Sequence, residues 1–363
     1  MSGAAGYRLL TVAPEQRPAL ERFVLASPYG HFRQLPAWGD VAAYDGTPTV
    51  TLAVERQGRV CASLALTVRR LPRTPWTFLV GARGPIVGGD AAAVGLLVDG
   101  VREVARRHRS VFLRVDPDRP DGDDVIRPLL ARHGFQHVPR DWSSLSDPRI
   151  VMRVDLRPPE ADLLGAMRKK HRQHVRGAAK RGLKIRPAFD RHDVDRFAAL
   201  MTAHGQEKGF AVRGPEYFHA LWSRFVRAGL GELLLVELDG ETCGGGLVVL
   251  CGARSWFLYT ATDPRARGAF PGEPLYWEIM RWAKERGAEE CDFGGTGTGW
   301  PPDPDSPAYS RYFFKLGFNA QPVYLTGYYD LVFRRLPYRL VRLVEDHLLD
   351  HGPLLVNLLR GRA

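Results

Sequence analysis

With 363 residues, of which 45% are hydrophobic and 25% charged, the chain predicts about two globular domains and argues against intrinsic disorder. Its four cysteines lack Cys-x-x-Cys spacing, which argues against a disulfide framework or a zinc site and indicates a reducing, cytoplasmic environment. The net charge of +11 favours a polyanionic partner such as nucleic acid, anionic lipid or a phosphorylated substrate, although an arginine-rich composition bias would also raise it.

The first half of the chain contains an ordered series of predicted elements. Gln57–Leu66 has the pattern of a turn that leads into a strand, and Val98–His108 has helical periodicity. A buried strand over Val111–Asp116 follows, and then a short helix that ends at Gly134-Phe135.

The second half repeats this series in the same order. Asp239–Val248 again predicts a turn and strand, Leu275–Arg286 a helix, Glu290–Phe293 a strand, and Tyr309–Phe318 a short helix that ends in Gly-Phe. Corresponding landmarks lie 176 to 183 residues apart. Because ordered landmarks at nearly one spacing are hard to obtain by chance, the sequence predicts two copies of one α/β unit.

Each copy is expected to form a mixed sheet flanked by helices. Gly231–Leu238 and Arg254–Thr262 have the composition of strands, with Asp239-Gly240 as a tight turn after the first. The polar and proline-rich stretch Asp141–Pro159 predicts the joint between the copies.

Beyond Phe318 the pattern predicts one more strand, Val323–Tyr329, and a basic, leucine-rich helical tail, Leu331–Arg362. We expect the tail to pack on the first unit. Because apolar and arginine residues interleave in it, a peripheral membrane contact is the alternative. No apolar run approaches the roughly 18 residues of a membrane span, and Met1–Gly6 lacks the apolar core of a signal peptide.

Motifs of common catalytic sites are absent from the sequence. It has no Gly-x-Ser-x-Gly, no His-Glu-x-x-His and no phosphate-binding Gly-x-x-x-x-Gly-Lys-Ser/Thr, and no metal site is predicted. His171 and His174 lie three apart and are expected on a solvated helix face. Gly294–Gly299, after the strand that ends near Asp292, is either a mobile loop or one whose amides approach a substrate.

Arg265–Ala269 follows a predicted strand and precedes a helix, where acetyltransferases bind the pyrophosphate of acyl-CoA. Here Phe270 ends the motif, and Pro271 and Pro274 remove amide donors. An acyl-CoA-dependent N-acyltransferase is therefore an alternative function, although only half of the pyrophosphate-binding motif is present.

A basic helix is predicted over residues 168–181, with Gly182 as its cap. It holds seven Lys/Arg and no acid, and these like charges destabilise a helix unless an anion offsets them. A phosphate or nucleic-acid contact is favoured. The residues expected to make it are Arg168, Lys169, Lys170, Arg172 and Arg176.

Several motifs together resemble one family. In chain order they are Phe32–Gln34 with Trp38-Gly39, Arg83–Pro85, Asp116-Pro117, the Arg172…Gly182 helix, Asp292–Gly295 and Phe313–Phe318. This set resembles the FemABX aminoacyltransferases, which transfer an amino acid from aminoacyl-tRNA to an amine on a peptidoglycan precursor. The coiled-coil arm of some members has no counterpart.

The resemblance implies an α/β fold of two tandem GNAT-like (acyl-CoA N-acyltransferase-like) modules. Residues 1–150, completed by 320–363, would form the first module on the acceptor side, and 151–319 the second, with the transfer site. It implies no cofactor and no metal, with aminoacyl-tRNA as co-substrate and an amine-bearing peptide, lipid-linked or small-molecule acceptor.

The resemblance also implies the site residues. Lys315 would lie near the transferred carbonyl, and Asp116 would face the acceptor. The residues expected to contact substrate are Phe314, Tyr259, Trp38, Arg83, Gly294 and Gly295. Aminolysis of an activated ester needs a neutral amine, stabilisation of an oxyanion and a proton for the leaving oxygen, so no enzyme nucleophile is required.

The chain departs from the family where members bind a nucleotide-linked precursor. Ala42 stands in place of a lysine, and Glu207 in place of an arginine. The acceptor therefore stays open between a lipid-linked precursor, a nucleotide-linked one and a natural-product intermediate. A non-catalytic RNA- or membrane-binding protein of the same fold is a further alternative. Ala131–His133 precedes the first Gly-Phe, so the aromatic-lysine pair belongs to the second copy alone.

Overall fold

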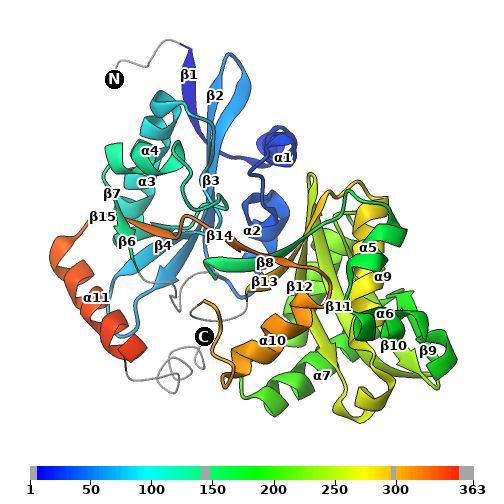
Figure 1. Cartoon of the computed structure of the whole chain (residues 1–363). Helices are drawn as coiled ribbons and strands as arrows, with labels where there is room; N and C mark the ends of the chain where they lie inside the picture. The colour runs from blue at the N-terminus through cyan, green and yellow to red at the C-terminus, as the bar shows by residue number, and fades with distance from the viewer. Residues whose placement is uncertain (1–5, 140–147, 296–299, 351–363) are drawn as a thin grey trace. The chain divides into compact units, whose positions relative to one another are not determined.

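The computed structural model describes residues 6–139, 148–295 and 300–350. The chain divides into two compact units, Met1–Arg149 with Tyr324–Ala363 (unit 1) and Ile150–Val323 (unit 2). Each unit contains a mixed sheet with helices packed on it, as Figure 1 shows. The α/β class predicted from the duplication is confirmed.

The sheet of unit 1 has the order β1-β2-β3-β4-β6-β15-β7, with β5 paired to β3. Its strands are β1 (Tyr7–Thr11), β2 (Thr49–Arg56), β3 (Arg59–Arg70), β4 (Thr77–Gly81), β5 (Ile86–Val87), β6 (Ser110–Val115), β7 (Phe135–Val138) and β15 (Tyr328–Val332). Its α-helices are α1 (Arg17–Ala26), α2 (Pro36–Ala42), α3 (Ala91–Arg107), α4 (Ile126–Arg132) and α11 (Arg335–Asp350).

The helix α3 shows how the unit 1 sequence specifies its core. Asp90 caps its N-terminus by accepting from the amides of Ala92 at 3.0 Å and Ala93 at 3.2 Å. Leu97 and Val101, four residues apart on one face, are buried against the sheet. The parallel pairing of β4 with β6 on either side of α3 is the crossover that the predicted strand, helix, strand order requires.

The sheet of unit 2 has the order β14-β8-β13-β12-β11-β10-β9. Its strands are β8 (Ile150–Asp155), β9 (Leu183–Pro187), β10 (Gly231–Leu238), β11 (Glu241–Cys251), β12 (Arg254–Thr262), β13 (Glu290–Gly295) and β14 (Gln321–Tyr324). Its α-helices are α5 (Glu160–Ala166), α6 (Lys169–Arg176), α7 (Arg191–Lys208), α8 (Pro215–Leu221), α9 (Gly272–Glu285) and α10 (Pro307–Leu316).

Glycines in β11 let helices approach both faces of this sheet. A Cβ atom at Gly245 would lie 2.7 Å from the ring of Phe197 in α7, and one at Gly246 would lie 2.8 Å from Ile279 in α9. Because neighbouring strand residues point to opposite faces, α7 and α9 cover opposite sides. The predicted tight turn between β10 and β11 is confirmed, with Asp239 and Gly240 at φ of 53° and 84°.

One local prediction was wrong. The segment expected as one strand, Val323–Tyr329, is two strands in different sheets, β14 and β15, because Gly327 at φ 85° interrupts the extended backbone. The division between the two units, at Arg149 and Ile150, falls within the expected joint Asp141–Pro159, which also contains the buried strand β8. Residues 140–147 lie outside the described part. The C-terminal tail forms the helix α11 up to Asp350, and residues 351–363 lie outside the described part of the chain. No described helix is long and apolar enough to span a bilayer.

Candidate active site

Lys315 lies near the C-terminal end of α10 and is 7% exposed. Its Nζ atom donates to the carbonyl oxygen of Gly295 at 2.7 Å and to that of Gly294 at 3.0 Å. These acceptors belong to the end of β13, so the sequence-predicted lysine and the predicted glycines meet at one point. A buried ammonium held by carbonyl dipoles can stabilise negative charge that develops beside it.

The two acceptor carbonyls come from adjacent residues, although successive carbonyls of a regular strand point in opposite directions. The register between β13 and β8 shifts between Asp292 and Gly295, which marks a β-bulge. Gly294 supplies the bulge with a φ of 73°, in the left-handed region that favours glycine. The bulge turns both carbonyls toward Lys315.

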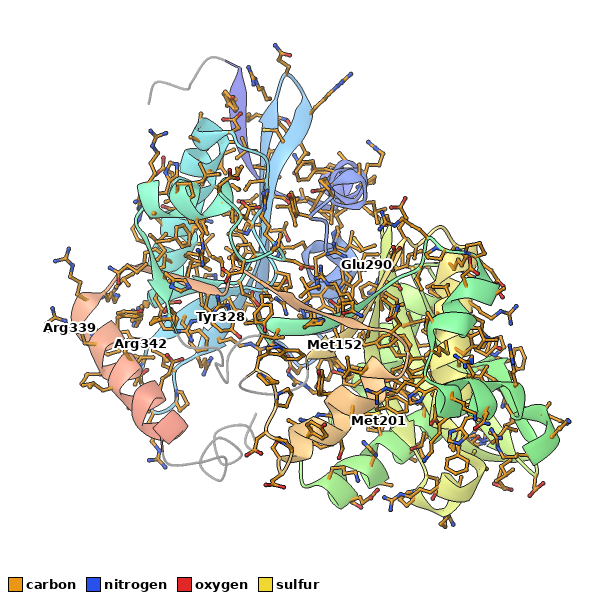
Figure 2. The ribbon with its side chains drawn as sticks, in the orientation of Figure 1. Met152, Met201, Glu290, Tyr328, Arg339 and Arg342 are labelled. Atoms are coloured by element: carbon orange, nitrogen blue, oxygen red, sulfur yellow. The ribbon has the colours of Figure 1, made fainter. Side chains whose placement is uncertain are left out.

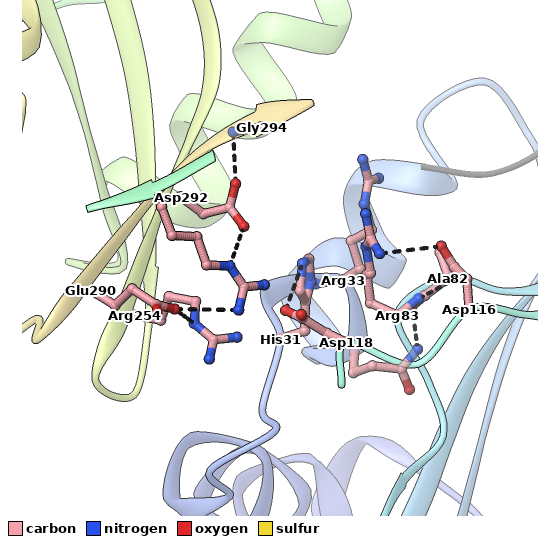
Figure 3. Close-up of polar contacts among 12 residues, drawn as sticks. His31, Arg33, Ala82, Arg83, Asp116, Asp118, Arg254, Glu290, Asp292 and Gly294 are labelled. Atoms are coloured by element: carbon pink, nitrogen blue, oxygen red, sulfur yellow. Dashed lines mark hydrogen bonds and ion pairs between the residues drawn. The ribbon is translucent and has the colours of Figure 1, made fainter. Parts of the chain in front are cut away.

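A buried carboxylate fixes this bulge. Asp292 accepts from the amide of Gly294 at 2.6 Å through one oxygen and from Nε of Arg153 at 2.9 Å through the other. Arg153 lies in β8, directly opposite Asp292 of β13, and its guanidinium is also 3.4 Å from the carboxylate of Glu290. Arg254 forms a second ion pair with Glu290 at 2.5 Å. Figure 3 shows the chain of charges leading to Gly294. Because buried charges need partners, this network holds the strand end in one conformation.

Burial lowers the pKa of Lys315 from 10.5 to about 7, because an ammonium loses solvation in the interior. The negative charge of Asp292 opposes this effect, and the positive charge of Arg311 adds to it. At neutral pH the group therefore lies close to the midpoint of its titration, where it can exchange a proton.

The basic helix α6 packs directly on the end of α10. The amide of Arg168 donates to the carbonyl of Gly317 at 2.9 Å, and Nε2 of His171 donates to the carbonyl of Phe314 at 3.0 Å. The guanidinium of Arg168 lies 3.9 Å above the ring of Phe313. The carbonyl of Phe314 also accepts from the amide of Gly317 at 3.0 Å, so α6 supplies further donors to the carbonyl groups at the end of α10.

The expectation that both histidines of α6 lie on a solvated face is wrong. His171 is buried against Phe318, and His174 contacts Glu273 at 2.8 Å and stacks on the ring of Phe270. Residues three apart share one face of a helix, and this face is the one that packs on the core. Burial lowers the pKa of His171, which favours the neutral ring that donates through one nitrogen.

The five basic residues expected at a tRNA surface separate into two groups. Three have exposed side chains: Lys169, Lys170 and Arg176. Arg172 is turned inward and donates to the carbonyls of Gly165 at 2.7 Å and Met167 at 2.5 Å. Arg168 stacks on an aromatic ring, as described above. The exposed group is free to bind a polyanion, whereas the inward group holds α6 in place.

Two of the aromatic residues predicted to contact substrate, Phe314 and Tyr259, lie in unit 2 at different depths. Phe314 packs edge-on against Tyr276 at 5.0 Å and belongs to the core side of α10. Its neighbour Phe313 is 49% exposed and is the aromatic side chain that a ligand could reach from solvent. Tyr259 of β12 is half-buried, and its hydroxyl donates to that of Tyr217 at 3.2 Å.

In unit 1, Asp116 follows β6 and is buried. One oxygen accepts from the amide of Arg83 at 2.8 Å, and the other lies 3.8 Å from the guanidinium of the same residue. Figure 3 shows this pair. Arg83 has a φ of 58° and also donates to the carbonyl of Pro148 at 2.9 Å. The structure thus brings together two residues that the sequence placed in one site.

Trp38, in α2 of unit 1, is half-buried. The guanidinium of Arg33 lies 4.5 Å above its ring, and Phe32 meets it edge-on at 5.2 Å. A cation over an indole face is a favourable contact, so this early motif forms one aromatic and cationic cluster.

The loop compared with an acyl-CoA site forms a short 3-10 helix, Pro264–Ala269. The amide of Arg265 donates to the side chain of Asp263 at 2.8 Å, and the amide of Phe270 donates to the carbonyl of Arg267 at 3.1 Å. Arg267 itself forms an ion pair with Glu207. These groups are engaged within the protein rather than directed to a phosphate.

Three residues that organise the site were not among the predicted site residues: Asp292, Arg153 and His171. Asp292 was visible as a strand-end aspartate before two glycines. Arg153 was not predicted because it interrupts an apolar strand, and polar residues in Asp141–Pro159 were interpreted as the joint between the two units. Within the described residues, no group of three or more His, Cys, Asp or Glu side chains could hold a metal ion.

The chain is similar to known proteins over most of its length. The family model described as an acetyltransferase (GNAT) domain matches residues 165–302. Lipid II:glycine glycyltransferase of Staphylococcus aureus (strain MRSA252) is 25% identical over 403 aligned residues, covering 90% of this chain and 94% of the relative.

Solved structures give the same fold. The crystal structure of FemX superposes with a TM-score of 0.83 at 24% identity, over 92% of this chain and 99% of that one. A tandem GNAT protein from the clavulanic acid biosynthesis pathway superposes with a TM-score of 0.53 at 15% identity, over 90% and 98%. The predicted tandem GNAT fold is confirmed, and the chain is a homologue of the lipid II:glycine glycyltransferases with the fold of FemX.

Proposed function

We propose that this protein is an aminoacyltransferase that moves an amino acid from aminoacyl-tRNA to an amine of a peptidoglycan precursor and so forms an amide bond. Homology to a glycyltransferase over 90% of the chain supports the reaction class. Glycine as the amino acid and lipid II as the acceptor are the first pair to test, because they are the ones in that relative's name. Since aminoacyl-tRNA is a cytoplasmic substrate, we propose that the enzyme acts there.

The observation that carries this proposal is the buried Lys315 at the bulged end of β13. Two of the three N–H groups of its ammonium are taken by the carbonyls of Gly294 and Gly295. Among the described residues the third N–H group has no acceptor, and we propose that it donates to a reacting oxygen. This arrangement is suited to a reaction that needs charge stabilisation and one proton but no covalent enzyme intermediate.

The chemistry follows from these groups. The neutral nitrogen of the acceptor attacks the ester carbonyl carbon, a C–N bond forms, and the carbonyl oxygen becomes an oxyanion beside Lys315. The C–O bond to the ribose then breaks, and the ribose oxygen takes a proton. With a pKa of about 7, the Lys315 ammonium can supply that proton, and the attacking nitrogen loses one to solvent or to the lysine amine.

Asp116 is proposed as the acceptor-side residue. Its carboxylate is oriented by the amide of Arg83, and a carboxylate so fixed can hold an incoming ammonium until it loses its proton. Arg83 lies close enough to share that charge, so the pair would also discriminate between acceptors.

The exposed face of α6 is proposed as the tRNA contact. Lys169, Lys170 and Arg176 are exposed there, whereas Arg168 and Arg172 are engaged with the protein. Phosphate binding releases counterions, so neutralising the exposed three should lower the slope of log K against log salt by about 0.7 to 0.9 for each phosphate that is no longer bound. A matched control replaces three exposed arginines of unit 1, Arg22, Arg59 and Arg70, with Gln.

Acyl-CoA is not proposed as the donor, and no resident cofactor or metal is proposed. The turn that would bind its pyrophosphate has amides bonded within it and prolines beside it, and Arg267 is paired with Glu207. These contacts weigh against phosphate binding at that place.

The deciding experiment offers purified protein labelled glycyl-tRNA or labelled acetyl-CoA together with lipid II. We expect label to pass from tRNA to the lipid, and Lys315→Met to abolish transfer while tRNA binding persists. Transfer from acetyl-CoA but not from tRNA would overturn the proposal. Full turnover by Lys315→Met would remove the lysine from the mechanism.

A further inference from the structure

The C-terminal helix α11 has an inner face that is firmly attached to unit 1. Arg114 of β6 is buried between Asp330 at 2.7 Å and Glu345 of α11 at 2.7 Å. The hydroxyl of Tyr338 donates to Asp330 at 2.9 Å, and its ring meets that of Phe112 edge-on. Figure 1 shows α11 beside β6. These contacts fix which face of the helix points outward.

The outer face of α11 is apolar, which is unusual for a helix packed on a protein by its other side. Its exposed large side chains are Leu336 at 74%, Leu340 at 62%, Leu343 at 66% and Val344 at 55%. Leu336, Leu340 and Val344 follow one another at spacings of four residues, and Leu343 lies three residues after Leu340, which places the four side chains on one stripe. Single exposed leucines are ordinary, but a stripe of this kind marks a surface that binds something apolar.

The charges around this stripe are of one sign. Arg334, Arg335 and Arg339 are exposed beside it, and Figure 2 shows Arg339 on the outer side of the helix and Arg342 nearer the sheet. Among the described side chains of α11, Glu345 is the acid, and it is turned inward to Arg114. The exposed surface therefore combines leucines with arginines and carries no compensating carboxylate in the part described.

We propose that this outer face of α11 is a docking surface for an anionic lipid bilayer. Leucines on such a helix enter the boundary between head groups and acyl chains, while arginines extend to lipid phosphates. A second copy of the chain fits less well, because a self-complementary contact through this stripe would bring the arginines of both copies together. The helix lies on the membrane and does not cross it, in keeping with its length and composition.

The proposal is independent of the transfer reaction, since lipid binding is measured without tRNA or acceptor. The full chain is mixed with vesicles of phosphatidylcholine alone or with added phosphatidylglycerol, and bound protein is sedimented. We expect binding to the anionic vesicles, reduced by salt. Replacing Leu336, Leu340 and Leu343 with Ser should weaken it by about tenfold or more, because apolar burial and charge both contribute.

Two controls make the outcome decisive. Phe189→Ser removes a 72% exposed apolar side chain from unit 2 and should leave vesicle binding unchanged. Circular dichroism should show the triple variant folded, because the replaced side chains are exposed. Undiminished vesicle binding by the triple variant would overturn the proposal. So would a wild-type dimer that this variant converts to a monomer without weakening vesicle binding, since the stripe would then cover a second copy.

Discussion

The ring of His171 occupies the space in which a side chain at Gly317 would begin. A Cβ atom at that position would lie 2.1 Å from Nε2 of His171. The same nitrogen donates to the carbonyl of Phe314, one residue before Lys315. The glycine of the Lys-x-Gly-Phe sequence is therefore required for close approach of α6, and α6 in turn sets the end of the helix that carries the lysine.

Gly317→Ala should be destabilised by about 1 to 3 kcal/mol, because an added methyl group overpacks a site closed by a ring. It should also lower transfer more than it lowers tRNA binding, since the displaced element is the end of α10. Urea unfolding and single-turnover transfer measure the two effects. The double variant with His171→Ala should recover stability.

Gly165→Ala is the matched control. This glycine lies in α5, and a Cβ atom there would meet nothing within 4 Å. Alanine should be neutral or stabilising at such a helical position. If Gly317→Ala proved as stable as this control, the ring of His171 would not be the reason for the glycine.

The pair Arg114 and Asp330 makes a prediction about unit 1. Both are fully buried, and Asp330 accepts from Nε at 2.8 Å and from Nη2 at 2.7 Å. Asp330→Asn leaves Glu345 as the remaining carboxylate beside the buried guanidinium of Arg114. The free energy of unfolding, measured in urea, should fall by about 3 kcal/mol. The exposed pair Arg157 and Asp155 is the control, and Asp155→Asn should cost less than about 1 kcal/mol. Equal losses of stability for the two variants would contradict this assignment.

Lys315 should give the protein a pH-dependent stability. Its pKa is about 7 when folded and 10.5 when unfolded, so between these values the unfolded chain binds a proton that the folded protein does not. Stability therefore rises with pH in this window and is independent of this group below it. Relative to Lys315→Met, the wild type should gain about 2 kcal/mol between pH 7 and 9.

Urea unfolding of both proteins at each pH measures this difference, because groups common to both cancel. Parallel pH profiles for the wild type and Lys315→Met would show that the lysine titrates at its ordinary pKa and is not desolvated.

Much of the fold was readable because it repeats. The series of turn, helix, strand and Gly-Phe helix recurs in both halves, and β10 with its Asp239-Gly240 turn lies where its composition indicated. Lys315 could be singled out because Phe313–Phe318 resembles a motif of the FemABX family. Its contacts with Gly294 and Gly295 joined two motifs that had each been noted separately.

The other features of the site depend on strand register and helix packing, which cannot be deduced from a single sequence. Arg153 became meaningful only opposite Asp292 in the register of β8 with β13. The side of α6 that faces the core followed from packing on α10, since a run of basic residues has no apolar stripe to orient it. For the same reason the division between exposed Lys169 and inward Arg172 was not predictable.

Asp292→Asn should move the pH dependence of transfer. In the proposed mechanism the ammonium of Lys315 is the active form, so the rate falls as pH rises through its pKa. The charge of Asp292 raises the pKa of Lys315, so its removal should shift the alkaline limb to lower pH. Asparagine keeps an oxygen for the amide of Gly294, but its NH2 group cannot accept from Nε of Arg153, so we also expect a loss of stability in urea unfolding.

Glu290→Gln is the control for Asp292→Asn. It removes a neighbouring carboxylate that also contacts Arg153 but does not act on the pKa of Lys315, so its alkaline limb should stay in place. NMR titration of the Lys315 side chain measures the change in its pKa directly. This measurement does not need turnover, so it can also be made on a variant that is too slow to assay. An unchanged pKa in Asp292→Asn would mean that the carboxylate shapes the bulge alone and that the field at Nζ comes from the carbonyls of Gly294 and Gly295.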